Sequence, residues 1–413
     1  MAKIKAFKGW RPIKEKVHLV ASRPYDVLST EEARIEVEAN PLSFLHVVKP
    51  EIDFPADQNP YAPEVYLKGK ENFEALLANA TFFQDDNDCI YIYRLTMDGK
   101  SQSGIVAAAA ISDYFNNVIK KHELTRPDKE ADRKKHVRVS EMNAEPVFFA
   151  YPALDSLDVI VEGIVKEDPE YNFTADDGVR HELWVVNGKV ADNIIIEFDK
   201  LPATYVADGH HRTAAAALVG QDLRQENPSY SGEESFNYFL AVHFPDNQLN
   251  IIDYNRVVKD LNGMSKEEFL SKLTNGFDVS LIGKNIYKPS KLHEIGMYLE
   301  GEWYKLIAKN GTFDDHDPIG VLDVTILSKQ ILEPVLEIID LRTDKRIDFV
   351  GGIRGLGELE KRVDSGEMKV AFALSPVSMQ QLIDIADSGE IMPPKTTWFE
   401  PKLRSGLVVH SLK

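Results

Sequence analysis

Apolar residues recur along this chain with two different spacings, which predicts that helices and strands are both present. A spacing of three to four residues is typical of an amphipathic helix, and residues 105–123 show it most clearly. Ile111, Phe115, Val118 and His122 would share the inward face of that helix. Further helices are predicted at residues 30–38, 265–273 and 289–299, from Thr125 onward, and from Ser378 to Gly389.

Continuous apolar runs between turn residues predict the strands. The runs lie at residues 146–151, 159–165, 183–186, 194–198, 239–244 and 302–308, with a hairpin formed by residues 89–95 and the segment before Ser103. Because these elements do not follow a regular strand–helix–strand repeat, they favour an α+β fold with a mixed sheet. Composition changes near Asp253, which predicts one domain at residues 1–254 and a second α/β subdomain at residues 255–413.

Composition limits the classes of function. The 413 residues carry 48 basic and 66 acidic side chains, and a net charge of −18 disfavours binding to nucleic acid or to anionic membranes. The single cysteine, Cys89, excludes an intrachain disulfide and predicts a buried structural thiol. No run approaches the ~18 apolar residues of a membrane span, and the N-terminus lacks the apolar core of a signal peptide. These features predict a cytoplasmic protein.

The most distinctive segment is the turn Asp-Gly-His-His-Arg-Thr, which separates a β-prone run from an alanine-rich helix. Glycine permits a sharp turn, and a helix N-terminus offers unpaired N–H groups to an anion, for which phosphate is the best fit. An ordinary helix cap would need only the aspartate. A zinc site is less favoured because adjacent helical histidines point about 100° apart. The predicted phosphate-binding residues are Asp208, Gly209, His210, His211, Arg212 and Thr213.

Five further residues are candidates for chemistry. In the ionisable segment 122–133, Glu123 would act as general base and Arg133 would be a second phosphate-binding cation, with His122 orienting one of them; a solvated charged helix is the alternative. Asp26 would place a carboxylate near a hydroxyl substrate or Mg²⁺, or would only form a turn. Lys395 precedes two threonines and would hold phosphate, unless its loop only packs on the core.

Several common signatures are absent from the chain. It contains no GxxxxGK[ST] phosphate loop, no HExxH zinc motif and no GxSxG nucleophile motif. The glycine-rich stretch at residues 351–357 has the wrong spacing for a dinucleotide fingerprint and predicts a turn. No set of metal-ligating residues is predicted.

Four ordered motifs together resemble the domain of unknown function family 1015: Tyr25-Asp-Val, the segment 122–133, the turn that begins at Ala207, and Pro393–Lys402. The last motif departs from the family at Thr396, Trp398 and Glu400, where serine and two tyrosines are usual. The Gly-His-His-Arg turn is similar to the Gly-x-x-Arg phosphate turn of the ParB/sulfiredoxin-like fold, which includes nucleotide-binding ParB proteins, sulfiredoxin and a free-serine kinase. This resemblance implies a ParB/sulfiredoxin-like nucleotide-binding core within residues 1–254.

The residues and the resemblance together predict a small-molecule kinase that transfers phosphate from ATP or ADP, with Mg²⁺, to a small hydroxylated metabolite. Free L-serine is the first acceptor to consider. Two alternatives stay open. One is a phosphatase or phosphoserine hydrolase that uses His210 or His211 as acid and base. The other is a ParB-like nucleotide-binding regulator that binds DNA, against which the acidic charge argues. The sequence leaves the oligomeric state open.

Overall fold

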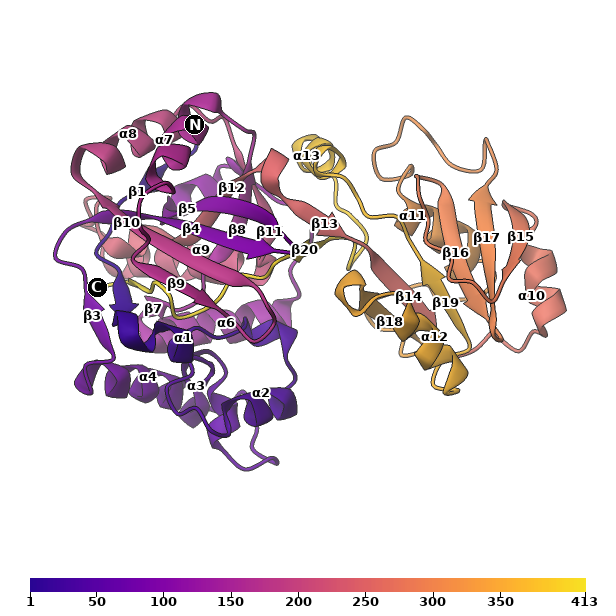
Figure 1. The fold of residues 1–413 in the computed structure, drawn as a ribbon, viewed down its shortest axis with the longest axis horizontal. Helices are drawn as coiled ribbons and strands as arrows, with labels where there is room; N and C mark the ends of the chain where they lie inside the picture. Colours follow the sequence, from indigo (N-terminus) through magenta and orange to yellow (C-terminus); the bar gives the residue numbers. More distant parts are fainter. The chain divides into compact units, whose positions relative to one another are not determined.

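The computed structural model describes residues 1–413 and divides them into two compact units. The first unit consists of residues 1–249 together with residues 401–413, and the second consists of residues 250–400 (Figure 1). The end of the chain therefore returns to the first unit, whereas the sequence had placed it with the C-terminal subdomain. None of the helices combines the length and the apolar character needed to cross a bilayer.

A nine-stranded mixed sheet forms the centre of the first unit. Its order is β6 (Ile119–Lys120), β11 (Thr204–Asp208), β8 (Val147–Tyr151), β12 (Tyr238–Pro245), β5 (Lys100–Ala110), β4 (Cys89–Met97), β10 (Arg180–Asn187) and β9 (Tyr171–Thr174), with β1 (Ile4–Lys5) beside β5. The β6–β11 and β8–β12 pairs are parallel and the other pairs are antiparallel. The sheet is mixed, as predicted. The parallel pairing of β6 with β11 positions residues of the candidate site described below.

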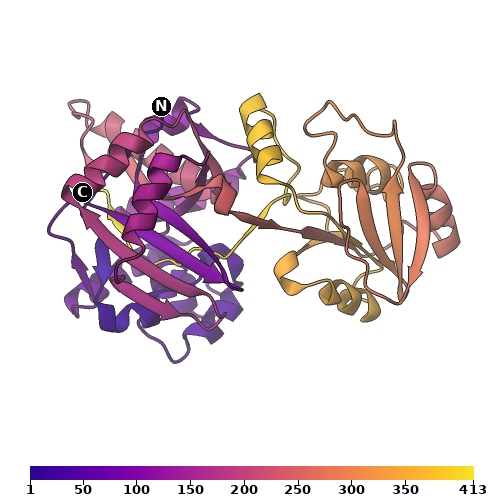
Figure 2. The ribbon, with the colours of Figure 1, turned by 45° about the horizontal axis from the view of Figure 1, so that its top comes forward.

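Helices pack around the sheet of the first unit. They are α1 (Val17–Val20), α2 (Thr30–Val37), α3 (Leu45–Val48), α4 (Pro63–Ala78), α5 (Ile111–Phe115), α6 (Pro127–Ser140), α7 (Asp155–Ile164), α8 (Gly188–Phe198) and α9 (His210–Glu226). Helices α7 and α8 lie together against one side of the sheet (Figures 1 and 2). Helix α6 packs against α9. This contact brings together two segments that are about 80 residues apart in sequence.

Two small strand pairs complete the first unit. Strand β2 (Trp10–Pro12) pairs with β3 (Phe82–Gln84), and β7 (Met142–Asn143) pairs with β21 (His410–Ser411). The second pair fixes the end of the chain in the first unit, and Val409 and Ser405 extend this attachment through bridges to Trp10 and Ser22. The returning segment is therefore a structural part of the first unit.

The second unit contains a six-stranded antiparallel sheet. Its order is β15 (Phe277–Gly283), β17 (Glu302–Ala308), β16 (Glu294–Leu299), β19 (Val370–Ala373), β14 (Tyr254–Val258) and β18 (Ile347–Gly351). Its helices are α10 (Lys266–Leu273), α11 (Asp323–Leu327), α12 (Gly357–Asp364) and α13 (Met379–Ser388). Strand β13 (Asn250–Ile252) pairs with β20 (Trp398–Glu400), so the chain enters and leaves this unit side by side.

Four predicted elements are wrong in type. Residues 105–110 belong to strand β5 instead of a helix, because β4 and β12 flank this strand on both sides. In a strand buried on both faces, apolar and polar residues do not need to alternate. Residues 105–110 therefore lack the alternation that would have predicted a strand. Helices α7 and α8 occupy the runs predicted as strands at 159–165 and 194–198, where β-branched residues misled the prediction. Strand β16 replaces most of the predicted helix at 289–299.

Candidate active site

The turn between β11 and α9 has the geometry of an anion-binding helix start. Gly209 has φ +95°, a left-handed conformation that favours glycine. A Cβ atom at this position would lie 3.1 Å from the Nε of Arg212, so the backbone approaches the guanidinium closely. No side chain caps α9, and its first turn carries no acidic residue. The positive end of a 17-residue helix is thus left without a carboxylate of its own.

Arg212 is buried beneath this turn, with 7 % of the residue exposed. Its Nη1 donates to the carbonyl of Pro146 at 2.6 Å, which fixes the guanidinium. Its Nη2 lies 3.4 Å from Asp208 Oδ2 and 3.9 Å from Asp26 Oδ2. Both distances are longer than the usual N–O distance of a charge-assisted hydrogen bond. The Nε is buried and has no hydrogen-bond partner. Arg212 therefore retains donor capacity for a ligand oxygen.

Asp208 is a charge partner of two cations. Its Oδ2 lies 3.4 Å from the Nζ of Lys402 as well as 3.4 Å from Arg212. Burial opposes ionisation, but Lys402 and Arg212 outweigh it and hold the pKa of Asp208 well below its usual range. The carboxylate is therefore negative at neutral pH and repels phosphate. Asp208 is thus paired with two cations in the structure, and its contact with phosphate stays a prediction.

Two parallel strands explain why residues 122–123 meet the turn. β6 and β11 run side by side with Ile119 opposite Thr204, so their carboxyl ends reach the same edge of the sheet. The rings of His122 and His210 meet there edge to face, with centroids 4.5 Å apart. Glu123 Oε2 lies 3.9 Å from His210 Nδ1. His122 is buried, as predicted, but through this strand pairing and not through a helical stripe.

The buried imidazoles are neutral at physiological pH. Burial lowers the pKa of His122 to about 4, and burial together with His122 holds the pKa of His210 well below its usual value. His210 therefore adds no positive charge to the turn at neutral pH. Its Nε2 is buried without a hydrogen-bond partner, so the neutral ring keeps one nitrogen for a ligand.

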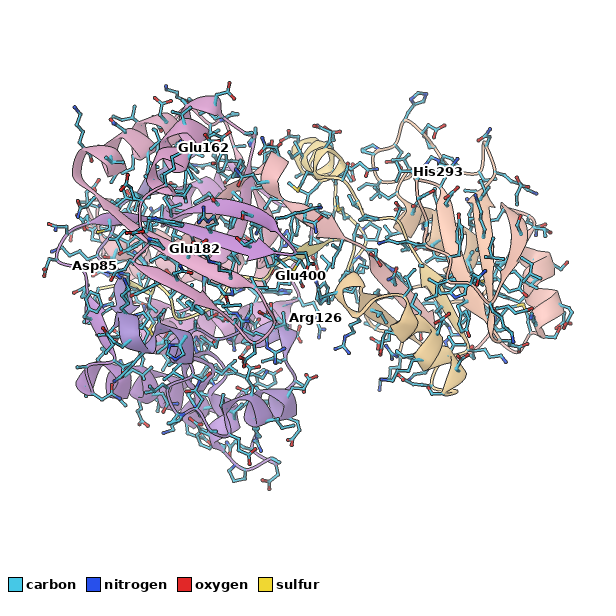
Figure 3. The ribbon with its side chains drawn as sticks, in the orientation of Figure 1. Asp85, Arg126, Glu162, Glu182, His293 and Glu400 are labelled. Carbon is cyan, nitrogen blue, oxygen red and sulfur yellow. The ribbon has the colours of Figure 1, made fainter.

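His211 connects the two helix starts. Its Nε2 accepts the backbone N–H of Arg126 at 2.9 Å, which ties the beginning of α6 to the beginning of α9 (Arg126 is labelled in Figure 3). Glu123 precedes Arg126 by three residues, and about a third of its side chain is exposed. The α6–α9 contact therefore places a partly exposed carboxylate beside the turn.

Arg133 and Asp26 are both neighbours of Tyr25, and Asp26 also approaches Arg212. Arg133 is buried, its guanidinium lies 4.0 Å from the ring centroid of Tyr25, and its Nη2 is 2.9 Å from Asp132 Oδ2. These contacts give it a packing and charge-balancing role, and they orient Tyr25. Asp26 follows directly and reaches Arg212 with a side chain that is 39 % exposed.

Sequence reasoning missed Glu145 and Lys402. Glu145 is buried, accepts the N–H of Tyr25 at 3.1 Å and lies 3.9 Å from Arg133 Nη1. Burial raises the pKa of Glu145, while Arg212 and Arg133 act against this rise. No pattern in the sequence marks Glu145. Lys402 ends the motif Pro393–Lys402, in which only Lys395 was a predicted phosphate-binding residue.

Two other predicted residues make contacts of their own in the structure. Thr213 is fully buried, and its hydroxyl donates to the carbonyl of Gly209 at 3.0 Å, so this hydroxyl is already used within the helix. Lys395 belongs to the second unit, where its Nζ lies 6.0 Å from the ring centroid of Tyr254. Its contact with phosphate stays a prediction. No group of three or more His, Cys, Asp or Glu side chains is arranged to hold a metal ion.

Comparison with known proteins places the chain in a family. A family described as "Protein of unknown function (DUF1015)" matches residues 4–325. No curated protein is significantly similar in sequence.

Solved structures give only distant likenesses. A conserved hypothetical protein from Pyrococcus furiosus is 14% identical, with 73% of this chain and 93% of that chain covered and a TM-score of 0.35. A free serine kinase in complex with AMP is 13% identical, with 72% and 86% covered and a TM-score of 0.32. SbnI from Staphylococcus aureus, truncated at its C-terminus, is 11% identical, with 71% and 82% covered and a TM-score of 0.38. Likenesses this distant do not determine a function.

Proposed function

Because the chain belongs to the DUF1015 family, whose description names no reaction, we propose a function from the chemistry of the turn: a phosphotransferase that moves a nucleotide phosphate to a small hydroxylated metabolite. The observation that carries the proposal is the meeting of an uncapped helix start with the buried, unpartnered Nε of Arg212. Phosphoryl transfer requires mainly positioning and neutralisation of charge. Backbone N–H groups and a guanidinium supply both.

The proposed acceptor base is Glu123. Its Oε2 lies 3.9 Å from Nδ1 of the neutral His210 ring, and about a third of its side chain is exposed. Asp26 lies instead 3.9 Å from the cationic Arg212. Glu123 would accept the hydroxyl proton of the acceptor, and His210 would orient the Glu123 side chain.

Mg²⁺ would accompany the nucleotide phosphates in this proposal and neutralise their charge. Asp26 would be an additional oxygen ligand, since Asp208 already faces two cations. The resemblance of the Gly-His-His-Arg turn supports two further parts of the proposal. The first unit would be a nucleotide-binding core of the ParB/sulfiredoxin-like type, and free L-serine is the first acceptor to test.

The test is a direct assay. We expect the purified chain, incubated with Mg²⁺, L-serine and either ATP or ADP, to form phosphoserine that ³¹P NMR and mass spectrometry detect. Glu123→Gln is expected to lower kcat by about 10²-fold or more, the usual contribution of a general base. Glu197→Gln is the matched control, because it makes the same substitution in α8, where Glu197 pairs with Lys200. Absence of transfer to a panel of hydroxylated metabolites with both nucleotides would reject the proposal.

The same preparation separates the hydrolase alternative. A phosphatase would release phosphate from phosphoserine without nucleotide. The burial of His210 argues against it as an acid and base, because a ring with so low a pKa is not protonated at neutral pH. Release of phosphate without nucleotide would favour the hydrolase over the kinase.

A further inference from the structure

Three charged groups at the turn share one carboxylate oxygen at distances longer than those of the tightest ion pairs of this chain. Asp208 Oδ2 lies 3.4 Å from Arg212 Nη2 and 3.4 Å from Lys402 Nζ. Tight ion pairs elsewhere in the chain have shorter N–O distances, such as 2.7 Å for Arg11–Asp85 and 2.6 Å for Lys200–Glu197. One carboxylate oxygen is thus shared by two cations and binds neither of them tightly.

One donor in this arrangement is unsatisfied, because the Nε of Arg212 is buried and has no hydrogen-bond partner. The site is partly open to solvent, because 17 % of the Lys402 side chain and 30 % of the Asp208 side chain are exposed. A phosphate group has three terminal oxygens and more negative charge than a carboxylate, so it would attract both cations more strongly and could accept from Arg212.

We propose that Asp208 is an internal counter-anion, shared by Lys402 and Arg212 in the absence of ligand, and that a ligand phosphate binds by taking these two cations from it. This inference rests on the proposed function only for the identity of the anion as a phosphate. Lys402, delivered by the returning segment 401–413, is then the second phosphate-binding cation of the site. Asp208 sets the affinity by competing with the ligand.

The competition has two opposite consequences for binding. Removal of the Lys402 charge takes away a favourable contact, so Lys402→Met is expected to weaken the binding of inorganic pyrophosphate by about tenfold. Removal of the Asp208 charge takes away both the competitor and a repulsion, so Asp208→Asn is expected to strengthen it by about tenfold. A purely structural role for Asp208 predicts weaker binding in the second variant.

The experiment is isothermal titration calorimetry of the full chain with inorganic pyrophosphate and with ADP at two salt concentrations. Lys200→Met is the matched control, because Lys200 is also paired with a carboxylate in the first unit, and it should bind as the wild type does. Lys402→Arg keeps the charge and should retain most of the affinity. Thermal unfolding of each variant shows whether it is folded. If Asp208→Asn does not fold, the comparison of Lys402→Met with Lys402→Arg tests the inference.

The outcomes distinguish this inference from the proposed function. Wild-type affinity in Lys402→Met, or weaker binding in Asp208→Asn, would overturn the inference even if phosphoserine is formed. The expected changes in affinity without any phosphoryl transfer would support the inference and reject the kinase. No binding of either probe by the wild type would overturn both.

Discussion

Single residues at the turn show which parts of the site a sequence can reveal. Gly209 and Arg212 could be predicted, because the local sequence of the turn at residues 208–213 is enough to suggest an anion site. Glu145 and Lys402 could not, because they reach the site through strand pairing and the return of the chain. The protonation state of His210 also depends on burial, which no local pattern discloses.

Gly209 gives the first prediction. In Gly209→Ala a Cβ atom would enter a left-handed position and contact Arg212 at 3.1 Å. We expect a loss of about 1–3 kcal/mol in the free energy of unfolding, together with loss of pyrophosphate binding. Gly178→Ala is the matched control, since Gly178 has φ +80° with nothing within 4 Å of the added atom. Urea unfolding and calorimetry should show similar destabilisation in both variants but impaired binding only in Gly209→Ala.

His122 gives a prediction for pH dependence. Its pKa is lowered from 6.5 to about 4 by burial, so the unfolded chain binds the extra proton between these values. The stabilising effect of the neutral ring is therefore complete above pH 6.5 and is lost as the pH falls towards 4. His122→Phe should reduce the difference in unfolding free energy between pH 7.5 and pH 4.5 by about 2 kcal/mol.

Urea titrations at the two pH values measure that difference. His18→Phe replaces an exposed histidine and should leave the difference unchanged. An unaltered pH dependence in His122→Phe would mean that the His122 ring titrates normally in the folded protein. It would then be able to carry a positive charge at the turn near neutral pH.

At the scale of elements, the sequence predicted helices with strong local signals and failed where tertiary contacts decide. The helix predicted at residues 30–38 is present as α2, which begins with a capping box between Ser29 and Glu32. Residues 105–110 were included in a predicted helix because of the apolar spacing that follows them, yet β4 and β12 enclose these residues as a strand. Pairing partners, which are distant in sequence, outweighed the local pattern.

Gly104 tests this strand directly. In β5 a Cβ atom at Gly104 would lie 2.7 Å from Phe244 Cε1 and 2.7 Å from Val242 Cγ1, both on the neighbouring β12. We expect Gly104→Ala to lose about 1–3 kcal/mol through overpacking. Gly163 in α7 has nothing within 4 Å, so Gly163→Ala should instead gain about 0.5–1 kcal/mol from helix propensity. Chemical denaturation of the two variants should show opposite signs, and a destabilised Gly163→Ala would argue against the helix at α7.

At the scale of the whole molecule, the second unit is an insertion into the first. The chain leaves the first unit after Leu249 and returns at Pro401, and Asn250 and Glu400 are paired neighbours in β13 and β20. The sequence indicated a division near residue 254 but gave no sign of the return, since residues 401–413 carry no pattern that names their partner strand. The return supplies β21, the bridge of Val409 to Trp10, and Lys402.

The insertion predicts that the first unit folds alone when its two pieces are joined. Because Asn250 and Glu400 are antiparallel partners, roughly four Gly and Ser residues should connect Leu249 to Pro401 without strain. We expect this variant to unfold cooperatively and to bind pyrophosphate as the full chain does. A chain that ends at Leu249 should be less stable and should bind weakly, because it lacks β21 and Lys402. If the joined variant folds but does not bind, residues 250–400 contribute directly to the anion site, and Lys395 becomes the first lysine to substitute.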